Sequence, residues 1–199
     1  TDVKTSFIAA FREYGLPNSV LSDNGAQFAG AHRGLSTFER FLMDLDILPI
    51  HGRPIHPQTQ GKIERFHRTF KQEALRTMPS DMADAAAKFE NWRWIYNEIR
   101  PHRALEMKTP ASVYQPSTRA YYTPKDYIYD EGAKLVKVNN WGYLRFGPIR
   151  LFLSEAMADT RVEVRFAEND TFLIIYRNYK IATVDAVEGK LLDRHIRRL

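Results

Sequence analysis

Apolar residues recur at helical spacing through most of the first 110 positions of the chain. The first such stripe predicts a helix over residues 3–14, ended by Gly15 and Pro17. The same spacing predicts helices over residues 35–45, 62–76 and 82–99. Two short apolar runs predict buried strands at 18–22 and 47–51, whereas the prolines and glycine of RPIHPQTQG, residues 53–61, predict an irregular segment.

The pattern changes after Pro110. Residues 113–130 hold five tyrosines and two prolines without a clear period, which predicts an extended linker. Further on, short strand-like stretches alternate with turn sequences: KLVKVN, GYLRF, IRLFL, RVEVRF, TFLIIY and YKIATVD. Their even spacing predicts a small antiparallel barrel. We therefore expect a first domain over 1–112, a linker over 113–132 and a barrel over 133–199.

Composition narrows the class of protein. A hydrophobic share of 44% and an aromatic share of 13% are typical of a globular chain. The chain has no cysteine, so a disulfide framework and a thiolate metal site are excluded. No stretch has the length and apolarity of a membrane span or the pattern of a signal peptide. These features predict a cytoplasmic protein without a membrane partner.

Positive charge is concentrated in one segment of the chain. The net charge is +5, and residues 51–76 hold six Lys and Arg side chains against Glu64 and Glu73. On a helical wheel, Glu64 lies at the border of a basic face that includes Arg68 and Lys71. One interpretation is an ordinary surface ion pair between Glu64 and Arg68 at i+4. The other is a carboxylate that serves a metal or phosphate site.

The stretch LSDNGAQF, residues 21–28, raises a similar choice. Asn24-Gly25 is a strong turn signal, because both residues tolerate positive φ. Asp23 is therefore either the first residue of a tight turn or a carboxylate held at a strand end for chemistry.

Three stretches in order carry a family resemblance: LSDNGAQF, then HPQTQGKIERFHRTFKQE at 56–73, then YNEIRPHRALEMKTPASVY at 96–114. Together they resemble the retroviral-integrase-like catalytic core of DDE transposases, in particular the bacterial insertion-sequence transposases of the IS481 type. The resemblance implies an α/β fold, an incomplete RNase H-like (integrase core) fold, followed by a small all-β SH3-like barrel. It implies DNA integration and transposition by a bacterial, nucleoid-associated protein.

The resemblance also assigns residues. Asp23 matches the second acid of the catalytic triad and Glu64 the third, so both are expected to ligate Mg²⁺ or Mn²⁺ in the two-metal site of the complete enzyme. Two such ions activate the attacking water or 3′-hydroxyl and stabilise the leaving oxygen. The expected DNA contacts are Lys62, Arg65, Arg68, Lys71 and Arg103. The expected partners are transposon ends, target DNA and further copies of the chain.

The first acid of the triad has no match. Only 22 residues precede Asp23, and Asp2 is expected to be a helix N-cap. The chain is therefore expected to be a transposase truncated at the front that neither cleaves nor joins DNA by itself. Two alternatives are a non-catalytic DNA-binding or assembly fragment of such a transposase and an SH3-like protein-interaction module.

Other residues have competing interpretations. His56 and Gln58 are expected to shape a loop beside DNA, and Trp92 is expected in the core. Arg100, His102 and Arg103 fit either phosphate contact or a helix C-terminus. In the barrel, Arg145, Arg150 and Arg165 are candidates for DNA contact, although an alternating strand exposes such residues in any case.

Overall fold

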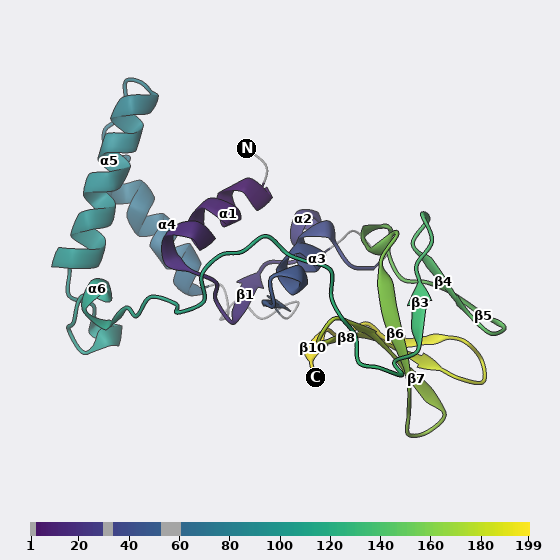
Figure 1. The fold of residues 1–199 in the computed structure, drawn as a ribbon. Helices are drawn as coiled ribbons and strands as arrows, with labels where there is room; N and C mark the ends of the chain where they lie inside the picture. The colour runs from purple at the N-terminus through teal and green to yellow at the C-terminus, as the bar shows by residue number, and fades with distance from the viewer. Residues whose placement is uncertain (1–2, 30–33, 53–60) are drawn as a thin grey trace. The chain divides into compact units, whose positions relative to one another are not determined.

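The structure is a computed structural model, and it describes residues 3–29, 34–52 and 61–199 (Figure 1). It divides into two compact units. The first unit joins Thr1–Pro54 to Ser117–Leu199, and the second is Ile55–Pro116. The bounds of these units differ from those of the domains expected at 1–112, 113–132 and 133–199. That division into domains stays a prediction.

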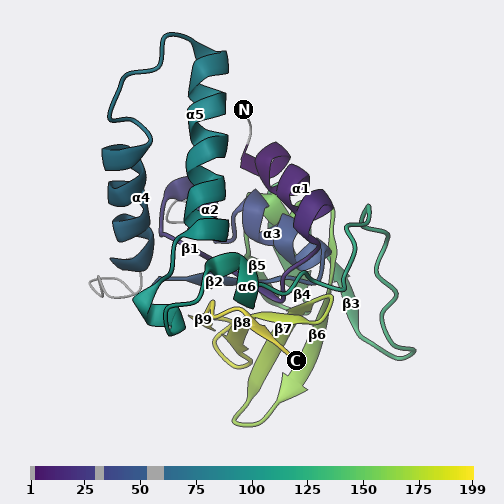
Figure 2. The same ribbon diagram turned by 90° about the vertical axis from the view of Figure 1, so that its left-hand side faces the viewer.

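The N-terminal part of the first unit alternates helices with two short strands. Its elements are α1 (Val3–Tyr14), β1 (Ser19–Ser22), α2 (Ala26–Ala29), α3 (Thr37–Asp44) and β2 (Leu48–His51). The helices predicted at 3–14 and 35–45 and both strands are confirmed, whereas α2 was not predicted. β1 and β2 form a parallel pair in which Ser22 faces His51 (Figure 2). The C-terminal ends of the two strands therefore meet at one edge.

Helix α3 contributes to two apolar clusters of the first unit. Phe38, Leu42 and Leu45 pack with Phe11 of α1, and the ring of Phe38 meets that of Phe7 edge to face. Met43 belongs instead to the cluster formed by the C-terminal strands. Because both sides of α3 are buried, the N-terminal part and the C-terminal strands of this unit share one packed helix.

An extended segment, residues 117–134, follows the surface of the first unit and contains no helix or strand, as expected of the tyrosine-rich linker. Arg119 fixes its start, since its guanidinium donates to the carbonyls of Pro17, Leu45 and Asp46 at 2.9 Å each. Gly15 has a φ of +79°, and a Cβ there would lie 2.9 Å from the Arg119 carbonyl. Gly15 therefore ends α1, as predicted, and its lack of a side chain lets the extended segment pass close to it.

The C-terminal part of the first unit, residues 133–199, is rich in strands. Its antiparallel six-stranded sheet has the order β10-β8-β7-β6-β3, with β9 also paired to β8. A separate hairpin pairs β4 with β5. The strands are β3 (Leu135–Lys137), β4 (Tyr143–Phe146), β5 (Ile149–Phe152), β6 (Arg161–Ala167), β7 (Thr171–Tyr176), β8 (Tyr179–Asp185), β9 (Leu191–Asp193) and β10 (Arg197–Arg198), with a 3₁₀ turn, η4 (Glu155–Met157), after β5. The predicted strands are present, whereas the SH3-like barrel itself is not confirmed.

The second unit is helical. Its elements are α4 (Gly61–Glu73), α5 (Met82–Trp94), the π-helical turn η2 (Ile95–Ile99), the 3₁₀ turn η3 (Arg103–Leu105) and α6 (Pro110–Val113). Helices α4 and α5 pack as an antiparallel pair (Figure 2), with Phe66 and Phe70 against the ring of Trp92. Trp92 is buried, which confirms its expected place in a core. Among the helices in the described ranges, none is long and apolar enough to cross a membrane.

Candidate catalytic carboxylates and nucleic-acid-binding surfaces

Asp23 directly follows β1, at the edge where the C-terminal ends of β1 and β2 meet. Its side chain is exposed, and Oδ1 accepts a hydrogen bond of 2.8 Å from the backbone N–H of Gly25. Asn24 Nδ2 donates to the carbonyl of Gly52 at 3.0 Å and so connects this loop to the end of β2. The turn and an accessible carboxylate are therefore both present.

The turn differs from the one that Asn-Gly usually makes. Neither Asn24 nor Gly25 has positive φ, because the turn closes through the Asp23 side chain and α2 begins at Ala26. Gly25 is needed for another reason. A Cβ at this position would lie 2.8 Å from Asp23 Oδ1, so a side chain would displace the carboxylate.

A partly buried polar cluster lies beside the Asp23 loop. His51 Nε2 donates to Glu39 Oε1 at 2.9 Å, and Ser22 Oγ is 3.2 Å from His51 Nδ1. The hydrogen bond to Glu39 raises the pKa of His51 above its ordinary value, although desolvation opposes this shift. Glu39 Oε2 also accepts the backbone N–H of Ser36 at 2.6 Å, which completes a capping box at the start of α3.

Glu64 lies in the first turn of α4, and its side chain is exposed. Arg65, Arg68 and Lys71 are exposed on the same helix. Lys62 lies in the same first turn, and its side chain falls outside the described part of the chain. Within the described part, Glu64 forms no ion pair, so the ordinary pairing with Arg68 is not observed. Among the described residues, this carboxylate therefore lies near cations without an ion-pair partner.

The three candidates after η2 have different roles. Arg100 donates to Glu73 at 2.7 Å and lies over the ring of Tyr96, so it holds the second unit together. Together with a hydrogen bond from Trp92, it lowers the pKa of Glu73 below its ordinary value. The ring of His102 packs against Tyr96. Arg103, in η3, is exposed and is the member of this group that remains available for phosphate.

Asp23 belongs to the first unit and Glu64 to the second, so their convergence stays a prediction. Their donor chemistry nevertheless fits a hard divalent cation. Asp23 Oδ2 and both oxygens of Glu64 have no hydrogen-bond partner among the described residues, and Mg²⁺ and Mn²⁺ prefer carboxylate oxygens. The described ranges contain no group of three or more potential metal ligands. Asp2, His56 and Gln58 lie outside these ranges.

A second basic surface lies on the β4–β5 hairpin. Arg145 and Arg150 are direct partners across the two strands, and the guanidinium of Arg150 lies 4.7 Å from the ring centre of Tyr143. They line a pocket of about 530 Å³ together with Lys137. Arg165 is different, because it is engaged by Glu163 at 2.8 and 3.0 Å. Arg145 and Arg150 are therefore the stronger candidates for an anion.

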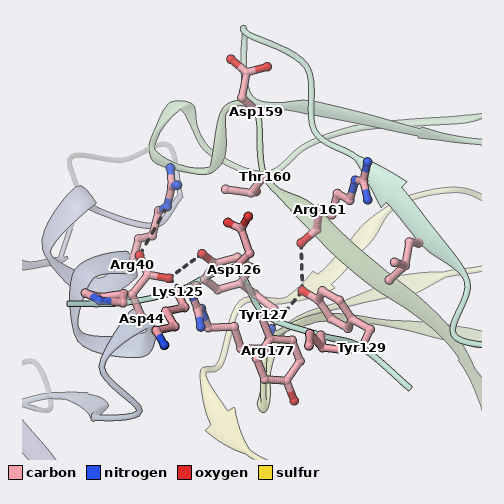
Figure 3. Close-up of a pocket in the computed structure, with 14 residues that line it drawn as sticks. Arg40, Asp44, Lys125, Asp126, Tyr127, Tyr129, Asp159, Thr160, Arg161 and Arg177 are labelled. Carbon is pink, nitrogen blue, oxygen red and sulfur yellow. Dashed lines mark hydrogen bonds and ion pairs between the residues drawn. The ribbon is translucent and has the colours of Figure 1, made fainter. Parts of the chain in front are cut away.

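A larger pocket of about 680 Å³ lies between α3, the extended segment and the C-terminal strands of the first unit (Figure 3). Asp44 of α3 accepts the Tyr176 hydroxyl at 2.6 Å and Arg177 Nε at 2.8 Å. Tyr129 donates to the carbonyl of Arg161 at 2.9 Å. Because these polar groups pair with one another, we interpret the pocket as a structural junction between α3 and the C-terminal strands of this unit.

Comparison with known proteins identifies the segment that contains Glu64. Residues 45–110 match a family described as the integrase core domain. This segment is therefore similar to integrase cores. It includes α4 with its cations and ends before the extended segment.

Individual proteins are similar to part of this chain. An insertion element IS136 protein of Agrobacterium fabrum is 33% identical over 91 residues, which cover 45% of this chain and 44% of that protein. An intracisternal A-particle Pol-related polyprotein of mouse is 33% identical over 106 residues, or 50% of this chain and 12% of that protein. A simian T-cell lymphotropic virus intasome structure, in complex with PP2A regulatory subunit B56 gamma, has a TM-score of 0.43 and 16% identity, over 87% of this chain and 60% of that one. The chain spans less than half the length of these two curated relatives.

These comparisons show that residues 45–110 are similar to the integrase core domain and that part of the chain is similar to insertion-element and retroviral proteins. Sequence reasoning missed the cluster of Glu39 and His51. The pattern Ser36-x-x-Glu39 is a capping-box signature that predicts half of it.

Proposed function

We propose that this chain is part of an IS481-type DDE transposase that cleaves DNA at transposon ends and joins it to a target. The observation that carries the proposal is the carboxylate of Glu64, which has no ion-pair partner among the described residues although it lies among the exposed cations of α4, inside the segment that matches the integrase core domain. A lone acid on a basic helix is normally neutralised by a neighbour at i+4. An acid kept free among phosphate-binding cations fits a metal ligand beside DNA.

Asp23 and Glu64 would hold the divalent metal in this proposal, Asp23 from a strand end and Glu64 from a helix. A bound metal pair supplies an activated nucleophile and stabilises the leaving oxygen in phosphodiester chemistry. The sequence offers two matching acids, whereas the full mechanism uses at least three carboxylates. We therefore expect no cleavage or joining of DNA by the 199-residue chain alone.

The cations of α4 would position DNA. Lys62, Arg65, Arg68 and Lys71 would contact phosphates, as would Arg103, and such contacts orient a duplex without reading its sequence. The complete transposase would act as a homo-oligomer on transposon ends and target DNA.

The test is binding of duplex DNA over a range of salt concentrations. Arg68→Ala with Lys71→Ala is expected to weaken binding to all sequences alike and to flatten the salt dependence by about one unit for each lost phosphate contact. Arg93→Ala is the matched control in the same unit, because Arg93 is paired with Glu90 at 2.7 Å. Unchanged affinity of the double variant at low salt would contradict the proposal.

A second candidate function is DNA binding or assembly without catalysis. The facing pair of Arg145 and Arg150 favours it, since the described residues that line the adjoining pocket include no acid that could hold a metal. The two candidates differ in their requirement for divalent metal at Asp23 and Glu64.

A further inference from the structure

A continuous chain of hydrogen bonds surrounds the loop that carries Asp23. It begins one residue before Asp23, where Ser22 Oγ meets His51 Nδ1 at 3.2 Å. His51 Nε2 continues it to Glu39 at 2.9 Å, and Glu39 continues it to the N–H of Ser36 at 2.6 Å. Ser36 Oγ then donates to the carbonyl of Phe28 in α2 at 2.6 Å. This series of hydrogen bonds therefore links β1, β2, α3 and α2, the four elements around the loop (Figure 2).

Helix capping alone does not account for this arrangement. A capping box uses one oxygen of Glu39, the one that accepts the N–H of Ser36. Glu39 is only 4% exposed, and a buried carboxylate is unfavourable unless its oxygens are satisfied. Its second oxygen has a partner because the register of the parallel pair places His51 opposite Ser22.

Two further hydrogen bonds fix the Asp23 loop and its carboxylate. Asn24 Nδ2 holds the loop to Gly52, the residue after His51, and the N–H of Gly25 holds Asp23 Oδ1. Oδ2 has no hydrogen-bond partner among the described residues. The loop is thus fixed on both sides while one carboxylate oxygen stays available.

We propose that His51 and Glu39 are positioning residues that fix the direction of the Asp23 carboxylate for metal binding. The role of the metal in this inference rests on the proposed function. His51 braces the strand end before Asp23 against the buried Glu39, so the loop leaves β1 at a defined angle. Metal sites depend on such supporting hydrogen bonds, because a ligand held loosely binds the ion more weakly.

The test compares variants of the 199-residue chain by NMR. His51→Leu removes the brace, whereas His51→Gln keeps a donor for Glu39 and serves as the rescue variant. His195→Leu, at an exposed histidine of the C-terminal strands, is the control. Three quantities are measured: amide exchange at Gly25, amide exchange at buried Ile174 in β7, and the Mn²⁺ concentration that broadens the Asn24 and Gly25 signals by half.

We expect His51→Leu to speed amide exchange at Gly25. We also expect it to raise, about tenfold, the Mn²⁺ concentration that broadens the Asn24 and Gly25 signals by half. Exchange at Ile174 is expected to stay unchanged, and His51→Gln and His195→Leu are expected to resemble the native chain. The inference is overturned if amide exchange at Gly25 is unchanged in His51→Leu. It is also overturned if Gly25 and Ile174 exchange faster by the same factor, since that would indicate general destabilisation.

Failure of the proposed function gives a different result. In that case the Asn24 and Gly25 signals of the native chain do not respond to Mn²⁺, or Asp23→Asn leaves their response unchanged. Exchange at Gly25 in His51→Leu then decides alone whether His51 orders the loop.

Discussion

Arg145 of β4 and Arg150 of β5 lie directly opposite each other in an antiparallel hairpin. Like charges in facing positions destabilise a strand pair, because their side chains leave the same side of the sheet. The residues that line the adjoining pocket in the described chain include Lys137 and no acid. A bound anion would remove the repulsion.

This pairing predicts opposite effects on stability and on DNA binding. Arg145→Ala is expected to keep or raise the free energy of unfolding by about 0.2–1 kcal/mol while weakening affinity for duplex DNA. Urea unfolding and a DNA titration at low salt measure the two quantities. Arg165→Ala is the control, because Arg165 is already engaged by Glu163. An Arg145→Ala protein that binds DNA like the native chain would show the hairpin to be a solvated surface only.

The pair of Asp193 and Lys180 predicts sensitivity to acid. Burial opposes ionisation of Asp193, but hydrogen bonds from Lys180, the N–H of His195 and Thr183 outweigh it and lower the pKa of Asp193 to about 2. A lowered pKa stabilises the folded chain above the pKa of the unfolded state, about 3.9, and this contribution is lost as the pH falls toward 2.

We therefore expect Asp193→Asn to be less stable than the native chain at neutral pH, because it leaves the buried ammonium of Lys180 without its partner. We also expect the difference to shrink between about pH 4 and pH 2. Thermal unfolding at a series of pH values measures it. Glu188→Gln, which breaks an exposed ion pair with Lys190, serves as the control. An acid profile of Asp193→Asn parallel to that of the native chain is incompatible with the assignment.

Asp44 connects α3 to the C-terminal strands through Tyr176 and Arg177. Asp44→Ala is expected to lower the free energy of unfolding by about 1–3 kcal/mol, because Nε of the largely buried Arg177 and the Tyr176 hydroxyl both lose their acceptor. Urea unfolding followed by fluorescence measures the change. The exposed pair of Asp159 and Lys137 supplies the control, since Asp159→Ala should cost less than about 1 kcal/mol. Equal effects of the two variants would argue against a structural junction at Asp44.

Local patterns predicted much of the secondary structure. The apolar stripe over 3–14 and the cap at Gly15 match α1, and the strand-like stretches after residue 133 match β3 to β8. The four-residue α2 and the short strands β9 and β10 were not predicted, because elements of this length carry too little periodicity to distinguish them from turns. The helix predicted over 82–99 ends as a π-helical turn from Ile95, which a stripe of apolar residues does not reveal.

The candidate sites could be predicted only in part. The resemblance names Asp23 and Glu64 as candidate ligands, and this assignment stays a prediction. Local sequence also predicts the cap by Glu39. The partner of Glu39 could not be predicted, since His51 reaches it only after the two parallel strands pair in register. The bond from Tyr176 to Asp44 likewise joins residues 132 positions apart. Such contacts depend on tertiary packing.

We propose that Asp23 and Glu64 share one divalent metal. Paramagnetic broadening of their amide signals by Mn²⁺ measures whether they do. A shared ion is expected to broaden the amide signals of Asp23 and Glu64 with the same midpoint concentration. Asp23→Asn is expected to abolish the response at Glu64, and Glu64→Gln the response at Asp23, since each variant removes a ligand of the same ion. Signals that titrate independently, or a response at one residue that survives loss of the other, would contradict the shared site.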